Sequence, residues 1–360
     1  MSAATNRGTI LSVAAALVLL FVFTTILNSA YRATRQSLAD SRYRRGLSLA
    51  QSGRQQQAVE EFSAALTYSH GDSRYRLALV RSLIDLGRWN EAATHLQELS
   101  EDDPTDGEVN FLRARIAARD RRDSEAVTYF NRAIYGYWSD HADENRLAAR
   151  FELVGVLEHA GQEKQVLAEL LQLADECPPD NVAGRLRIAH LLLAHGSPDH
   201  AAEVYRGVLA SAPKQSAALE GLGEAEFAMG DFRAARGSWR AALRLEPGSP
   251  ALERRIVVCE AVLDLDPTQV HLRAGQRFER AQEVLRRTLN ASRQCAAMAG
   301  ELASSAEAAL AENPARRRDG DTLAIISLAQ QIWKARTSSC TPPAEADAAL
   351  DAVMAKLQKQ

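Results

Sequence analysis

Turn residues that recur at a fixed spacing constrain the fold more than any other feature of this sequence. The turn positions are 53, 87, 121, 161, 196 and 230, and all are glycine except Arg121. Successive positions lie 34, 34, 40, 35 and 34 residues apart. A regular period of this length indicates one helical pair repeated along the chain. Such pairs must stack, because one pair cannot bury its own apolar face.

Small and large residues keep the same register within each period. Alanine follows the turn by five residues in five of the six copies, and a large residue comes four later: Ala58 and Phe62, Ala92 and Leu96, Ala126 and Phe130, Ala201 and Tyr205, Ala235 and Trp239. The helix before the turn carries its own small residue in several copies, such as Gly46 and Gly223. Small residues let two helices approach closely, and glycine permits the left-handed backbone that ends a helix.

This pattern resembles the tetratricopeptide repeat (TPR) family over residues 39–250. The resemblance implies an all-α fold, a right-handed solenoid of helix-turn-helix repeats. We expect six repeats, at 39–72, 73–106, 107–140, 147–180, 182–215 and 216–249. The one long step contains residues 135–140, which we interpret as a loop insertion. Residues 251–360 are expected to form a helical cap, because the end of a solenoid needs a polar cover.

The N-terminus contains an uncharged stretch from Gly8 to Tyr31. As a helix it would span about 36 Å, enough for a bilayer core of about 30 Å. We therefore predict a tail at 1–8, a transmembrane helix at 9–30 and a single-pass protein of the cell membrane. A cleaved signal peptide is the alternative. Arginines after the stretch favour repeats in the cytoplasm, and a periplasmic location stays open.

Composition and motifs exclude several function classes. A net charge of −3 gives no overall attraction to nucleic acid. The chain has no phosphate-binding loop, no H-E-x-x-H zinc motif and no G-x-S-x-G nucleophile elbow. We predict no enzymatic activity, no cofactor and no metal site. The four cysteines, at 177, 259, 295 and 340, are expected to be buried. A disulfide between Cys295 and Cys340 is the alternative in an oxidising compartment.

The family resemblance implies that side chains of the first helix in each repeat line a concave groove. The partner-binding candidates are Tyr43, Arg74, Arg81, Phe111, Arg115, Arg119, Phe151, His159 and His190. Glu220, Glu224 and Phe227 are further groove positions at its acidic end. Arginine forks suit carboxylates, so the partner is expected to be acidic. Ordinary solvated charges are the alternative interpretation.

These features together predict a membrane-anchored scaffold or adaptor. It would bind a partner protein or peptide in its groove, contact the lipid bilayer through residues 9–30, and serve the assembly of a cell-envelope complex. Two alternatives remain. One is a structural subunit of an envelope machine that acts through its convex face or its C-terminal cap. The other is an enzyme with its site in 268–360.

Overall fold

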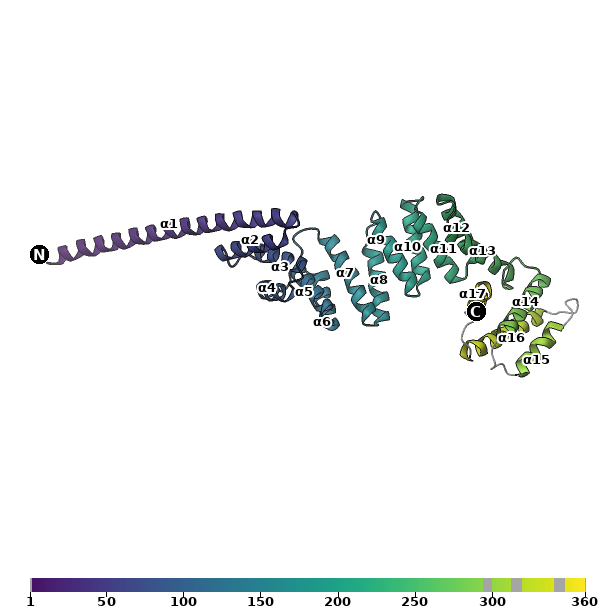
Figure 1. Cartoon of the computed structure of the whole chain (residues 1–360). Helices are drawn as coiled ribbons and strands as arrows, with labels where there is room; N and C mark the ends of the chain where they lie inside the picture. The colour runs from purple at the N-terminus through teal and green to yellow at the C-terminus, as the bar shows by residue number, and fades with distance from the viewer. Residues whose placement is uncertain (1, 294–299, 312–318, 340–346, 360) are drawn as a thin grey trace. The chain divides into compact units, whose positions relative to one another are not determined.

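The fold is entirely helical in the part of the chain that the structure describes. The computed structural model describes residues 2–293, 300–311, 319–339 and 347–359, and each regular element there is an α-helix (Figure 1). The chain divides into two compact units, Met1–Gln162 and Glu163–Gln360. Each unit is described by itself below. The division falls between the two helices of the fourth predicted repeat.

The first unit contains seven helices in its described residues: α1 (Ser2–Gln51), α2 (Gln55–Tyr68), α3 (Ser73–Asp85), α4 (Trp89–Asp102), α5 (Gly107–Arg119), α6 (Asp123–Tyr135) and α7 (Ala142–His159). Each packs against the next along the chain. Local sequence explains where they begin. The side chain of Asp72 accepts a hydrogen bond from Arg74 N at the start of α3, and Asp106 accepts one from Val109 N at the start of α5. Such caps satisfy backbone donors left free at a helix start.

The prediction of a transmembrane helix at 9–30, and with it a single-pass membrane location, is wrong. No helix in the described part of the chain has a stretch both long and apolar enough to cross a bilayer. Helix α1 runs unbroken from Ser2 to Gln51 and so includes residue 39, at which the first repeat is expected to begin.

The second unit contains α8 (Glu163–Glu176), α9 (Val182–Ala194), α10 (Pro198–Ser211), α11 (Ser216–Met229), α12 (Phe232–Leu245), α13 (Pro250–Leu265), α14 (Ala274–Arg293), α15 (Gly300–Ala311), α16 (Asp319–Ser339) and α17 (Ala348–Leu357). Helices α8 to α13 pack in chain order. Beyond them α14 packs against α16, and the last helix, α17, returns to pack against α13. Lys356 on α17 pairs with the buried carboxylate of Asp266, with Nζ 2.8 Å from Oδ2.

The recurring turns have the left-handed backbone conformation that their glycines predicted. All five turn glycines have positive φ, from +66° at Gly161 to +83° at Gly230. Arg121, the only turn residue with a side chain, adopts φ +62°. A β-carbon makes this region costly, so glycine suits the other five positions. The turn residues therefore determine where one helix ends and the next begins.

Close contact between paired helices explains the register of small and large residues. A β-carbon added to Gly223 on α11 would lie 2.5 Å from Cδ1 of Trp239 on α12. One added to Gly46 on α1 would lie 2.5 Å from Cε1 of Phe62 on α2. In the five repeats that have it, the alanine five residues after the turn is fully buried. Each large ring thus fills the space that a missing side chain leaves on the neighbouring helix.

Candidate functional site

The structure distributes the predicted groove residues over five helices. Eight lie in the first unit: Tyr43 on α1, Arg74 and Arg81 on α3, Phe111, Arg115 and Arg119 on α5, Phe151 and His159 on α7. His190 lies on α9 in the second unit, exposed to solvent. Whether these residues form a binding groove stays a prediction, and their surroundings bear on it.

The three aromatic candidates belong to the packed interior of the first unit. The Tyr43 ring lies 4.9 Å from the ring of Tyr75, centroid to centroid. The Phe111 ring lies 6.0 Å from the rings of both Phe130 and Trp138. Phe151 is buried. These rings therefore help to hold the helices together, although Tyr43 and Phe111 are half-buried and keep part of their surface exposed.

Several arginine candidates are held by carboxylates of the same unit. Arg81 on α3 forms two contacts with Glu108 on α5, of which Nη2–Oε2 measures 2.5 Å. Arg115 on α5 pairs with Glu152 on α7, with Nε 3.5 Å from Oε2. These pairs link alternate helices, α3 to α5 and α5 to α7. An acidic partner would have to compete with the chain's own carboxylates there.

The other two arginines make local contacts. Arg74 pairs with Asp72, the capping residue of its own helix, at 2.7 Å. Arg119 pairs with Asp120 at 3.0 Å, and its guanidinium lies 5.1 Å from the centroid of the Trp89 ring. His159, the last residue of α7, contacts Arg121 in the turn between α5 and α6. The predicted run of arginines is therefore a set of neutralised pairs.

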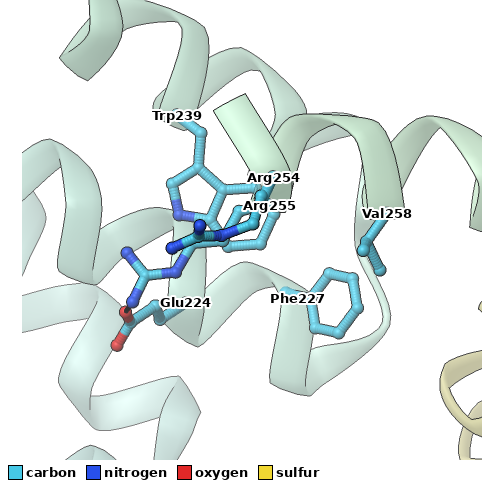
Figure 2. A pocket seen from close by; sticks show the side chains of 6 residues that line it. All are labelled: Glu224, Phe227, Trp239, Arg254, Arg255 and Val258. Atoms are coloured by element: carbon cyan, nitrogen blue, oxygen red, sulfur yellow. Dashed lines mark ion pairs between the residues drawn. The ribbon is translucent and has the colours of Figure 1, made fainter. Parts of the chain in front are cut away.

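A pocket in the second unit offers a more open site. It has a volume of about 350 Å³, and six residues of α11, α12 and α13 line it: Glu224, Phe227, Trp239, Arg254, Arg255 and Val258 (Figure 2). Glu224 and Phe227 were among the groove positions suggested by the sequence. The residues from α13 were missed, because α13 was interpreted as a cap and not as a further groove helix.

Packing between α11 and α12 builds the apolar floor of this pocket. Trp239 reaches α11 because Gly223 leaves room for its ring, and its Nε1 donates to the carbonyl oxygen of Glu220 at 3.2 Å. The Phe227 ring lies 5.5 Å from the Trp239 ring and 5.0 Å from the Phe232 ring. Phe227 and Val258 are half-buried, so parts of both side chains face the pocket.

Two arginines of α13 form the polar rim. Arg255 reaches back to α11, where its Nη2 lies 2.5 Å from Oε1 of Glu224 (Figure 2). Its Nη1 contacts Glu220, one turn earlier on the same helix. This is the alternate-helix pairing seen between Arg81 and Glu108. Arg254 is exposed, and no ion pair involves it in the described part of the chain. The rim thus holds one neutralised and one unneutralised guanidinium.

Histidine, cysteine and carboxylate side chains decide whether a metal ion or a reactive thiol could operate at these sites. Among the described residues, no three or more histidine, cysteine or carboxylate side chains lie together in a way that could hold a metal ion. Cys177 and Cys259 are buried free thiols. Burial raises the pKa of Cys259 to about 11 and so disfavours the reactive thiolate. The proposed pair of Cys295 and Cys340 lies outside the described residues.

Comparison with known proteins identifies the repeats. A family model described as "Tetratricopeptide repeat" matches residues 77–141 and 186–250. A curated relative, a cellulose synthase operon protein C of Escherichia coli O157:H7, is 26% identical over 214 residues. That match covers 58% of this chain but only 17% of the relative, so the chain spans about a sixth of the relative's length.

Solved structures of low sequence identity also resemble the chain. YrrB, described as a TPR protein with an unusual peptide-binding site, is 16% identical, with 54% of this chain and 97% of YrrB covered and a TM-score of 0.42. PilF of Pseudomonas aeruginosa is 17% identical, with 61% and 97% covered and a TM-score of 0.44. PilW, described as a type IV pilus biogenesis factor, is 16% identical, with 60% and 97% covered and a TM-score of 0.42.

Proposed function

We propose that this chain, which is built from tetratricopeptide repeats, is a protein-binding scaffold whose pocket between α11 and α13 receives a partner segment. The observation that carries the proposal is the pairing of an aromatic floor, formed by Phe227 and Trp239, with the free guanidinium of Arg254 at the rim. The partner is a protein segment with one large apolar side chain next to a carboxylate.

The size of the pocket supports a single anchoring side chain. Its volume of about 350 Å³ lies at the lower end of the range for ligand sites, about 300 to 1,000 Å³. Aromatic floors of this kind are typical binding hot spots, because a buried ring contributes a large apolar area at one place. Phe, Trp or Leu on the partner would fill it.

The charges of the rim support an acidic neighbour for that anchor. Arg255 already forms an ion pair with Glu224, so it contributes to the shape of the rim more than to its net charge. Arg254 remains available for a carboxylate of the partner, and guanidinium–carboxylate contacts are often bidentate. The expectation of an acidic partner is therefore kept, but the binding arginine moves from the first unit to α13.

Crosslinking in cells tests the proposal. The full-length protein and an Arg254→Glu variant would be purified after crosslinking, and their partners quantified by mass spectrometry. Arg244→Glu is the matched control, because Arg244 is an exposed arginine of α12 outside the pocket. We expect one partner to fall at least about tenfold with Arg254→Glu, the loss that follows from reversing one charge of a close pair. The control should retain it.

A second variant separates binding from folding. Phe227→Ala removes the floor without changing charge, and its melting curve shows whether the unit stays folded. If both pocket variants are folded and recover the same partners as the unmodified protein, the pocket is not the binding site. The function would then belong to another surface of the scaffold. The triple change of Arg81, Arg115 and Arg119 to glutamate tests the groove of the first unit in the same way.

A further inference from the structure

The insertion at residues 135–140 is held against the turn between α4 and α5. Tyr137 N donates to the Thr105 carbonyl at 3.0 Å, and Gly107 N donates to the Tyr137 carbonyl at 2.7 Å. Gly136 makes this approach possible, since a β-carbon there would lie 2.6 Å from the Arg132 carbonyl oxygen and 2.8 Å from that of Thr105. The backbone of the insertion is therefore closely packed.

Trp138 anchors the insertion from the other side. Its ring is buried against Gly107 at the start of α5, where a side chain would clash with it. Its Nε1 donates to the Ala133 carbonyl at 2.8 Å. The insertion is thus stabilised by one buried ring and three hydrogen bonds, two from backbone N–H groups and one from the indole. A rigid loop results.

Two tyrosines of this rigid loop point to solvent. Tyr135, the last residue of α6, is 75% exposed, and Tyr137 is 70% exposed. Neither ring covers the interior of the unit, which is covered by the Trp138 ring instead. Exposed tyrosines on a closely packed backbone are well suited to binding, because a tyrosine side chain has few rotatable bonds and loses little entropy when a partner covers it.

The surroundings of the two rings are acidic. The adjoining turn, residues 101–106, contains four carboxylates, and residues 139–144 contain three. Thr105 donates from its hydroxyl and its backbone N–H to Asp103 and lowers the pKa of that carboxyl. Three of these carboxylates have basic partners: Arg146 pairs with Asp143 at 3.6 Å, Arg76 with Asp102 at 3.7 Å, and His141 lies 3.4 Å from Glu144. Among the described residues no ion pair involves the other four, at positions 101, 103, 106 and 140, so carboxylates are in excess there.

We propose that Tyr135 and Tyr137, with the carboxylates at 101–106 and 139–144, form a docking surface for an arginine- or lysine-rich segment of a partner protein. We name it the tyrosine surface. A guanidinium is attracted to the face of an aromatic ring, and carboxylates beside the ring attract the same cation. An acidic segment or a nucleic acid would be repelled. The surface lies wholly in the first unit and is separate from the pocket between α11 and α13.

Fluorescence anisotropy with a basic probe tests the tyrosine surface. The full-length chain would be titrated into a fluorescein-labelled peptide of repeated Arg-Gly-Ser units, with a peptide of Glu-Gly-Ser units as the control probe. Two double variants are compared, Tyr135→Ala with Tyr137→Ala, and Tyr135→Phe with Tyr137→Phe. The first removes both rings, and the second keeps them. Melting curves confirm that each variant is folded.

We expect the alanine variant to bind the basic peptide about tenfold more weakly, and the phenylalanine variant to stay within about twofold, because the ring face carries the attraction. Arg254→Glu should leave this binding unchanged, so failure here and failure of the pocket proposal are distinguishable. The proposal is overturned by equal affinity of the alanine variant and the unmodified chain. It is also overturned by equal binding of the acidic probe, or by no binding of the basic one.

Discussion

Arg255 on α13 reaches Glu224 on α11, where its Nη2 lies 2.5 Å from Oε1. The two side chains are 35% and 33% exposed, so solvent screens the pair only in part. We expect Arg255→Ala to lower the free energy of unfolding by about 1 kcal/mol, since it also leaves Glu220 and Glu224 side by side. A double-mutant cycle with Glu224→Ala, followed by urea denaturation, measures the coupling.

The more exposed pair Arg240–Glu260 serves as the control for that cycle. Its side chains are 51% and 40% exposed, so its coupling energy should be smaller and should fall further in high salt. Equal coupling in the two cycles would contradict the role given to Arg255 in fixing α13 against α11.

Gly223 provides a test of the packing between α11 and α12. We expect Gly223→Ala to destabilise the chain by about 1–3 kcal/mol, because the new methyl group would overlap the Trp239 ring. The matched control is Gly237→Ala on α12, where a β-carbon meets nothing within 4 Å. That change should stabilise the helix by about 0.5–1 kcal/mol. A silent Gly223→Ala would mean that the assigned register is wrong.

The pair of Arg81 and Glu108 predicts a small and reversible effect. Arg81→Glu should cost no more than about 1 kcal/mol, since Arg81 is largely exposed. Combining it with Glu108→Arg should restore most of the loss, because the swap rebuilds the pair between α3 and α5. Thermal melts at low and high salt measure both effects. A double variant less stable than the single one would show that the pair does not depend on charge.

The buried thiol of Cys259 predicts a pH-dependent reactivity. With its pKa raised from 9.0 to about 11 by burial, its thiolate fraction at pH 8 should be about a hundredfold smaller than that of an unshifted thiol. We expect N-ethylmaleimide to label Cys259 slowly in the folded chain and rapidly in urea, as measured by peptide mapping. Fast labelling of the folded chain at pH 8 would show that the thiol is accessible.

The same shift has a consequence for stability at alkaline pH. The folded state binds the Cys259 proton more tightly than the unfolded state, so this stabilisation is complete below about pH 9 and is lost as pH rises toward 11. Cys259→Ser should flatten the decline in melting temperature over that window. An unchanged slope in this variant would assign the decline to other groups.

The helical pairs could be read from the sequence because their signals are local. Glycine at the turn, alanine five residues later and a large residue four beyond act through backbone sterics and contacts between neighbouring helices. Gly230, Ala235 and Trp239 show this in one repeat. The prediction of a membrane span at 9–30 was wrong. It rested on the absence of charged residues, which does not by itself make a helix apolar enough to cross a bilayer. No helix in the described part of the chain is long and apolar enough to cross a bilayer, and α1 continues past residue 30 as one helix.

The binding surfaces could not be read in the same way. In the sequence, Arg81 and Arg115 are typical of an open anion site. The sequence does not show that Glu108 and Glu152, on other helices, form ion pairs with them. The pocket is lined by side chains of α11, α12 and α13, and these side chains come together only when the three helices pack against one another. The sequence by itself determined an all-helical chain of repeated pairs, because turn and packing preferences act over a few residues. Tertiary structure decided which charges are neutralised and which remain free, because charge pairing depends on distances between residues far apart in the chain.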